Sequence, residues 1–433
     1  MSRRIRRSIV LLHFLRLLIL ASNGGSARVA CAENWPQFRG PTGQGQSSEQ
    51  GLPTTWGGKN DENILWKTPL PHVKPDAKPD LNQSSPIVWD ERIFVTTCCW
   101  PDKNSQKDFP EQHLTCYSIA EGKQLWDVLV APGPWRLSDL RGGYGAPTPT
   151  TDGERVYVAF GSAMIAAFKV ADGQLVWKHD LDKYEHFDVA FATSPIIYQD
   201  TILLLCDRNN KASSLLSLDC RTGEVKWEKE RPTVAFDHTT PILFSVQGKS
   251  QLLIGASNAL QAADPTTGEI LWSCRAKGDV PTPVYDGKLI YIDSGRGGPG
   301  YAVDPTGTGD VSATHVRWKV AQIPEGLSSP VIAGEWLYRL HNPGVVRCLN
   351  MTTGEEAFTQ RLEGVSTHAS PFTTADGLVY IASAGKSYVL KSGPKYELIA
   401  TNDLNDGTSA SPAVAQGKII FKGAKYLYGV GKK

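Results

Sequence analysis

The chain has 433 residues, of which 41% are apolar and 21% are charged, a balance typical of a globular protein. Its formal net charge is +1, but residues 1–32 contain six arginines and no acidic residue, so the remainder carries about −5. Nucleic-acid binding needs a basic surface, and this charge distribution therefore excludes nucleic acids as partners.

The first 32 residues predict a secretory signal peptide. Four arginines within residues 3–7 precede the apolar stretch 9–21, and Ala30-Cys31-Ala32 fits a cleavage site of the small-x-small type. A lipoprotein anchor on Cys31 is the alternative, although Arg28 stands where an aliphatic residue is expected. We expect cleavage after Ala32 and export to the periplasm or cell surface. No later stretch is long and apolar enough to span a bilayer, so the mature chain should lack a transmembrane segment.

Two features follow the leader and precede the first copy of a repeat that begins at Ser85. Residues 33–59 predict an N-terminal extension that packs on that domain. The segment Asn63–Lys67 reads as a single short strand with Trp66 near its end, and no hairpin partner follows it directly.

From residue 60 onward, one pattern recurs eight times. Each copy opens on a Pro, continues into short apolar segments, turns at Gly, and usually closes on Trp. A period of this size, here 41 to 61 residues, marks an array of small sheets. The openings are Ser85-Pro86, Ala146-Pro147, Ser194-Pro195, Thr240-Pro241, Thr282-Pro283, Ser329-Pro330, Ser370-Pro371 and Ser411-Pro412.

The second copy shows most clearly what the pattern builds. Val156–Phe160 and Met164–Phe168 are β-rich runs, and the turns Asp152-Gly153 and Asp172-Gly173 bound them. Asp-Gly favours a tight hairpin because it tolerates positive φ. Four antiparallel strands per copy, repeated radially, predict an all-β fold, an eight-bladed β-propeller over residues 60–433.

The outermost strands and the last copy predict how the ring closes. A closing Trp can bury a large area between blades. Copies six and seven carry Phe358 and Ile399 near that place, and the other closing residues are Trp126, Trp177, Trp227, Trp272 and Trp318. The eighth copy ends at Tyr426–Val430 without a fourth strand. We therefore predict that the N-terminal strand Asn63–Lys67 completes blade eight and removes the open sheet edges.

Connection lengths predict a binding face. In a propeller the turns between strands one and two and between strands three and four share one face, and here they are short. The other connections share the opposite face and are long, and length on one face marks the binding side of a repeat protein. The long connections are Trp100 to Gln112, Ala131 to Gly145, His179 to Ala192 and Asp293 to Gly300. The candidate ligand-binding residues there are Arg136, Arg141, Tyr144, His186, Asp188, Asp237, His238, Asp279, Arg296 and His368. His186 and Asp188 alone are too few to predict a metal site, and we predict none.

Seven cysteines remain after cleavage, and their spacing matches neither a zinc site nor a haem attachment site. They are interpreted as buried strand cysteines. A Cys98–Cys116 bridge across one hairpin stays open, because export permits disulfides.

The repeat resembles that of the quinoprotein-like propellers, the pyrroloquinoline quinone (PQQ) repeat proteins, in their BamB-like exported branch. The shared unit is Ser-Pro, then Asp-Gly before Val-Tyr-Val, then Leu-Asp-x-x-Thr-Gly-x-x-x-Trp, and Trp35–Pro41 resembles the opening of exported members. The resemblance implies either a PQQ- and calcium-dependent dehydrogenase or a non-catalytic protein. In the dehydrogenases an adjacent-cysteine disulfide packs on the quinone, which makes Cys98 and Cys99 a possible pair. The acidic base and calcium set of those enzymes cannot be placed here.

These observations favour an exported, non-catalytic binding or scaffolding module, monomeric and without a cofactor, whose partner is a protein or an extracellular polymer. The alternative is a quinone-dependent dehydrogenase of alcohols or sugars that uses PQQ and calcium. A second alternative is a polysaccharide-binding propeller that uses Trp100, Trp135 and Tyr144.

Overall fold

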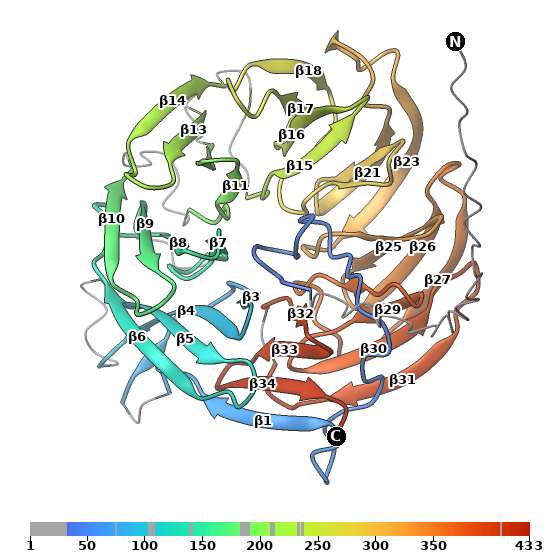
Figure 1. The fold of residues 1–433 in the computed structure, drawn as a ribbon. Coiled ribbons are helices and arrows are strands. Elements are labelled where there is room, and N and C mark those ends of the chain that lie inside the picture. The colour runs from blue at the N-terminus through green and yellow to red at the C-terminus, as the bar shows by residue number, and fades with distance from the viewer. Residues whose placement is uncertain are drawn as a thin grey trace, which may run out of the picture. The chain divides into compact units, whose positions relative to one another are not determined.

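The computed structural model describes residues 33–73, 76–102, 109–137, 142–181, 191–207, 213–231, 234, 238–407 and 409–433. Within these ranges the strands form eight antiparallel sheets arranged as the blades of a ring (Figure 1). The predicted all-β, eight-bladed propeller is confirmed. Over the same ranges, no helix has the length and hydropathy that a membrane crossing requires.

Blades one to four follow the chain in order. Blade one contains β3 (Ile87–Trp89), β4 (Arg92–Trp100), β5 (Glu111–Ser118) and β6 (Gln124–Val130), with β2 (Lys78–Pro79) beside β4. Blade two contains β7 (Thr150–Thr151), β8 (Arg155–Phe160), β9 (Met164–Lys169) and β10 (Leu175–Asp180). Blade three contains β11 (Ile196–Tyr198), β12 (Thr201–Cys206), β13 (Ser214–Asp219) and β14 (Val225–Glu230). Blade four contains β15 (Ile242–Val246), β16 (Lys249–Gly255), β17 (Leu260–Ala263) and β18 (Ile270–Cys274), with β22 (Gly309–Asp310) parallel to β18.

Blades five to eight complete the ring. Blade five contains β19 (Val284–Tyr285), β20 (Ile290–Asp293), β21 (Arg296–Val303) and β23 (Val316–Glu325). Blade six contains β24 (Val331–Ala333), β25 (Trp336–His341), β26 (Val345–Asn350) and β27 (Glu356–Arg361). Blade seven contains β28 (Phe372–Thr373), β29 (Leu378–Ile381), β30 (Lys386–Lys391) and β31 (Leu398–Asp403). Blade eight contains β32 (Ala413–Ala415), β33 (Lys418–Lys422), β34 (Tyr426–Gly431) and β1 (Ile64–Pro69).

The Asp-containing turns fold as their sequence dictates. The Asp152 carboxylate accepts hydrogen bonds from the N–H groups of Glu154 and Arg155 at 2.9 and 2.6 Å, and Gly153 takes a φ of 90°. In the turn between strands three and four of blade three, Asp219 accepts from the next residues in the same way. A side chain that satisfies local N–H groups stabilises such turns.

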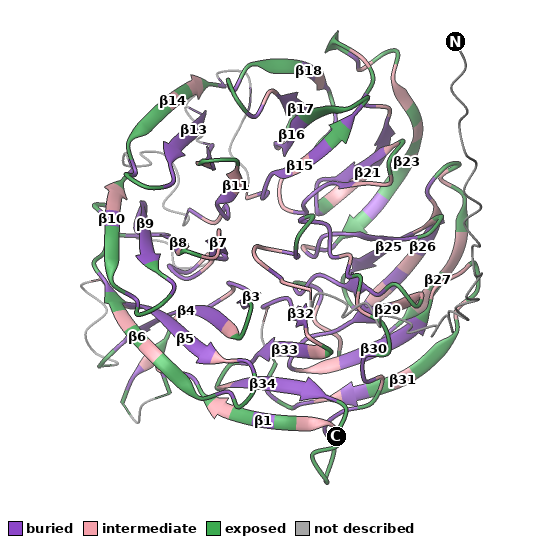
Figure 2. Ribbon diagram, in the orientation of Figure 1, coloured by how far each residue is buried: buried purple, intermediate pink, exposed green. Residues whose placement is uncertain are grey.

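Tryptophan rings on the outer strands seal one blade to the next. In five places the ring lies over the turn glycine of the following blade, where an added Cβ would approach it to between 2.3 and 2.8 Å. The pairs are Trp66 with Gly122, Trp126 with Gly173, Trp177 with Gly223, Trp227 with Gly268 and Trp318 with Gly354. Figure 2 shows the result, because the inner strands are buried while outer strands such as β6, β10 and β14 alternate between exposed and partly buried. The predicted role of the closing Trp is therefore confirmed.

Both ends of the propeller domain share blade eight, as predicted. Strand β1 pairs antiparallel with β34, with Trp66 opposite Gly429 and Thr68 opposite Leu427 (Figure 1). The Trp66 indole N–H donates to the carbonyl of Ile119 in blade one at 3.1 Å, which joins the closing strand to the first blade.

A ring of hydroxyl groups joins the blades at the centre. We call it the hydroxyl ring. In seven of the eight steps around this ring, a backbone N–H donates to the hydroxyl of the next blade at 2.9–3.2 Å, and one of the seven is the bond from Ser411 to Ser85 that closes the circle. Its members are Ser85, Thr148, Ser194, Thr240, Thr282, Ser329, Ser370 and Ser411. The second copy therefore opens on Thr148-Pro149, not on Ala146-Pro147 as the spacing suggested, because only Thr148 supplies the hydroxyl.

The segment 33–57 crosses the end of the ring that carries the turns between strands one and two, which we call the short-turn face. The carbonyl of Pro36 accepts from the N–H of Thr151, and the Gln44 amide oxygen accepts from the N–H of Tyr285 at 2.6 Å. In blade seven, the Thr373 N–H donates to the carbonyl of Gly45, and the Thr373 carbonyl accepts from the N–H of Ser47. These bonds fasten the segment across the axis of the propeller (Figure 1).

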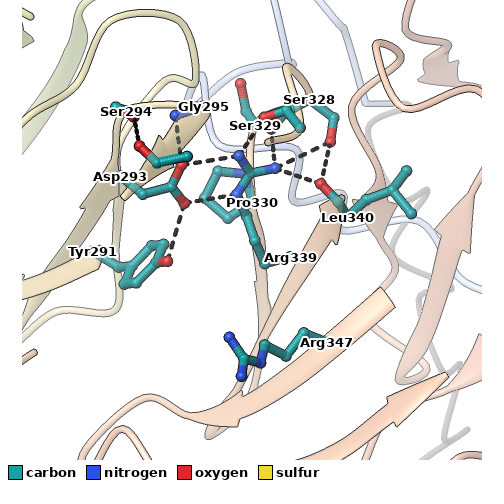
Figure 3. Close-up of polar contacts among 12 residues, drawn as sticks. Tyr291, Asp293, Ser294, Gly295, Ser328, Ser329, Pro330, Arg339, Leu340 and Arg347 are labelled. Carbon is teal, nitrogen blue, oxygen red and sulfur yellow. Dashed lines mark hydrogen bonds and ion pairs between the residues drawn. The ribbon is translucent and has the colours of Figure 1, made fainter. Parts of the chain in front are cut away.

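A buried ion pair joins blades five and six (Figure 3). Arg339 on β25 donates through Nε and Nη2 to the two oxygens of Asp293 at 2.7 and 2.9 Å. Asp293 ends β20, and β21 begins at Arg296 after a tight turn. The expected long connection from Asp293 to Gly300 is thus wrong, because the glycine-rich stretch pairs with β23 as an extended strand.

Candidate functional site

A cavity of about 680 Å³ lies on the propeller axis. Seven members of the hydroxyl ring line it, and Phe38 of the crossing segment lies against its floor. The upper wall of the cavity is formed by residues that precede the first strand of a blade. The cavity therefore opens toward the end of the propeller that carries the connections between strands two and three. We call this end the long-loop face.

Among the described residues that line the cavity, the charged side chains form one pair. The Arg296 guanidinium at the start of β21 lies 3.7 Å from the Asp279 carboxylate, and Arg296 is 55% exposed whereas Asp279 is 19% exposed. The backbone N–H of His238 donates to the carbonyl of Asp279 at 2.8 Å. This places an exposed cation at the mouth and a shielded carboxylate beneath it.

Burial sets the protonation of these groups. It raises the pKa of Asp279, although Arg296 opposes the shift. Burial, aided by Arg296, lowers the pKa of His238 to about 4. Partial burial also lowers the pKa of His368, whose side chain is still exposed at one side, against the opposing effect of Glu325. Both imidazoles are therefore neutral at neutral pH, and they offer hydrogen bonds rather than charge.

Four of the predicted site residues come together at this cavity, namely His238, Asp279, Arg296 and His368. Arg136 is exposed but does not line it. The remaining candidates Arg141, His186, Asp188 and Asp237 lie outside the described residues. The hydroxyl ring and Phe38 were missed. The Ser or Thr before nearly every opening Pro was the signal that could have revealed the ring.

Tyr144 belongs to the core instead of the binding face. It is 1% exposed, its ring packs edge-on against Trp100 at 6.2 Å, and its hydroxyl accepts from the N–H of Leu137 at 2.8 Å. Trp100 and Trp135 are also buried, at 2% and 1% exposure. The expectation that these three aromatics bind a polysaccharide is therefore wrong, because a glycan cannot reach them.

Cys98 and Cys99 are both free thiols. Successive residues of a strand point to opposite faces of its sheet. Cys98 packs with Leu114 and Tyr157 in the core between blades one and two, whereas Cys99 lies beside Glu111 on the other face. The structure thus joins neither Cys98 to Cys99 nor Cys98 to Cys116.

The described cavity residues are a poor fit to PQQ and calcium. Calcium takes six to eight oxygen ligands and favours several carboxylates. Among the described lining residues, Asp279 is the one carboxylate and Arg296 the one cation, and they face each other. A quinone with three carboxylates would find no second cation among them.

The sequence matches one family model, and the fold is similar to that of several solved structures. A family model described as outer membrane protein assembly factor BamB matches residues 58–311. The crystal structure of BamB from Moraxella catarrhalis has 14% identity and a TM-score of 0.58, over 85% of this chain and 98% of that one. A europium-containing methanol dehydrogenase has 11% identity and a TM-score of 0.64, over 92% and 90% of the two chains.

The quinohemoprotein alcohol dehydrogenase from Comamonas testosteroni has 12% identity and a TM-score of 0.65, over 92% of this chain and 81% of that one. No curated protein matches the sequence. At such identities the solved structures establish the shared fold alone. The family match covers more than half of the chain, and this protein therefore belongs to the PQQ-repeat β-propeller family of outer membrane protein assembly factor BamB.

Proposed function

We propose that this protein is an exported, non-catalytic binding module of the cell envelope, whose long-loop face receives a protein or polymer partner. The donor set of the central cavity carries the proposal. Its described residues offer hydroxyls, neutral imidazoles and one charged pair, Arg296 with Asp279. Such groups suit hydrogen bonding to a polar projection of a partner. The family membership supports the same conclusion.

The short-turn face is less suited to binding a partner. The segment 33–57 already covers the short-turn face and uses backbone groups of several blades there. The long-loop face keeps the exposed side chains of Arg296 and His368 beside the cavity mouth. Arginine at the centre of an interface is a common source of binding energy. A partner should therefore approach from the long-loop face.

Site-specific photocrosslinking tests the choice of face. A photoreactive residue at His368 should give a discrete crosslinked product in the native envelope, and one at Lys288, on an exposed short turn, should not. Arg296→Ala should reduce the His368 product roughly tenfold, the effect of losing about 1.4 kcal/mol of binding. Equal labelling from Lys288, or a product unaffected by Arg296→Ala, would contradict the proposal.

The runner-up function is a PQQ-dependent dehydrogenase, which the fold shared with solved dehydrogenases favours. Addition of PQQ and calcium to the purified protein should give neither stoichiometric quinone absorbance nor dye-linked oxidation of alcohols or sugars. Saturable binding with turnover would replace the binding module with an enzyme.

A further inference from the structure

Strands β4 and β5 of blade one bring a cysteine, a glutamate and a histidine to one point. Cys99 and Glu111 are directly opposite each other in the antiparallel pair, and His113 lies two residues farther along β5 on the same face. The Cys99 Sγ lies 4.0 Å from Glu111 Oε2, and that oxygen lies 3.4 Å from His113 Nε2. One atom from each residue falls within 4.8 Å of the other two.

A second layer of contacts fixes the orientation of the histidine. Its Nδ1 lies 2.9 Å from Asp127 Oδ2 on β6. The other Asp127 oxygen accepts from the Thr115 hydroxyl at 2.6 Å. A carboxylate on one ring nitrogen that turns the other nitrogen toward a common point is the usual surrounding of a metal-binding histidine.

The cluster is shielded but reachable. Cys99 is fully buried, and the His113 side chain is 9% exposed, whereas the Glu111 carboxylate is 30% exposed and gives a route from solvent. On the same face of the sheet, Val95 and Tyr117 pack against blade eight. The cluster therefore lies where the first blade meets the blade that closes the ring, and none of its three residues lines the axial cavity.

We propose that Cys99, Glu111 and His113 bind a divalent transition metal, with Zn²⁺ as the best match, and leave a fourth position for water or another ligand. Thiolate, imidazole and carboxylate are the three zinc ligands of proteins. A thiolate with a single carboxylate argues against magnesium and calcium, which prefer oxygen ligands.

The spacing of the ligand atoms fits this assignment. Zinc bond lengths at tetrahedral angles separate nitrogen from oxygen by about 3.4 Å and sulfur from oxygen by about 3.6 Å. The observed separations are 3.4 and 4.0 Å, so a small movement of the Cys99 side chain completes the site.

A proton is the competing occupant. Burial alone would lower the pKa of His113, but hydrogen bonds with Asp127, Cys99 and Glu111 outweigh it and raise that pKa to about 10. An imidazolium between two carboxylates would also hold the cluster together, without using the Cys99 thiol as a ligand. A metal ion needs the Cys99 thiolate as a ligand, whereas a proton on His113 does not. Replacement of Cys99 therefore distinguishes the two occupants.

Metal titration of the reduced, chelator-treated full-length protein tests the proposal. Zn²⁺ should bind in one equivalent by calorimetry, and Co²⁺ should give a thiolate-to-cobalt charge-transfer band. Cys99→Ser should abolish the band and weaken Zn²⁺ binding at least 100-fold. The matched control is Cys98→Ser, which removes the neighbouring thiol on the opposite face of the sheet and should leave both readouts unchanged.

A milder variant keeps the test decisive if Cys99→Ser does not fold. Asp127→Asn retains all three ligands and should weaken Zn²⁺ binding about 10–100-fold while the cobalt–thiolate band remains. Absence of stoichiometric Zn²⁺ binding by the folded wild-type protein would overturn the proposal. Equal affinity in wild type and Cys99→Ser would also overturn it and leave the proton as the occupant.

Discussion

Tryptophan rings and turn glycines depend on each other at the contacts between blades. The sequence Thr-Gly recurs because the glycine has positive φ and because the ring of the preceding blade leaves no room for a Cβ. At Gly223, φ is 74° and an added Cβ would lie 2.5 Å from the Trp177 ring. The Trp177 N–H also donates to the carbonyl of Cys220 at 2.9 Å, which holds the ring in place.

Gly223→Ala should lower the free energy of unfolding by about 2–5 kcal/mol, measured by urea denaturation. The left-handed backbone costs an alanine roughly 1–2 kcal/mol, and overpacking against the ring adds about 1–3 kcal/mol. Gly248→Ala isolates the first effect, since φ is 77° there and nothing lies within 4 Å of the added Cβ. Equal losses in the two variants would show that the Trp177 contact is not responsible.

Between whole elements, buried charge adds a second kind of contact. Arg339 on β25 donates to Asp293 at the end of β20, and its Nη1 also reaches the carbonyls of Ser328 and Leu340 (Figure 3). Burial would raise the pKa of Asp293, but Arg339 and the hydrogen bonds from Gly295 and Tyr291 lower it overall. The pair thus contributes stability above the unfolded-state pKa of about 3.9 and loses it as the pH falls through the lower folded value.

Arg339→Met should destabilise the protein by about 3–5 kcal/mol at pH 7, because it leaves a buried carboxylate without its cation. The loss should shrink toward pH 4, where Asp293 in the variant can take up a proton. The double variant Arg339→Met/Asp293→Leu removes both charges and should recover most of the stability at pH 7. Chemical denaturation at the two pH values measures both effects, and a loss independent of pH would contradict the electrostatic explanation.

The elements also show how far the sequence could predict the structure. Period, Asp-Gly turns and the closing Trp are local signals, and they sufficed for the blades and for the pairing of β1 with β34. Residues brought together from many blades were harder, because no local pattern reports which side chains point toward the axis. Tyr144 was placed at the site although it is core, and Thr148 was overlooked although it belongs to the hydroxyl ring. His238, Asp279, Arg296 and His368 were found because each lies near a blade opening or a hairpin on the long-loop face.

In the whole molecule, two separate sets of contacts close the ring, one at the inner strands and one at the outer rim. The hydroxyl ring ties the inner strands together, with Ser411 donating to Ser85 across the junction at 3.1 Å. Strand β1 performs the same task at the rim, where it covers β34 and carries Trp66 onto Gly122 of blade one. Without β1, the backbone groups of β34 would form an open sheet edge, which templates association with other chains.

Deletion of residues 60–70 should therefore convert the protein into oligomers or aggregates, as judged by light scattering after size-exclusion chromatography. A synthetic peptide of residues 60–70 added during refolding should restore the monomer, because it can occupy the vacant edge in the register of Thr68 opposite Leu427. A scrambled peptide of the same composition supplies no matching Trp66 and should not rescue. A soluble deletion variant as stable as the wild type would show that the propeller does not rely on β1.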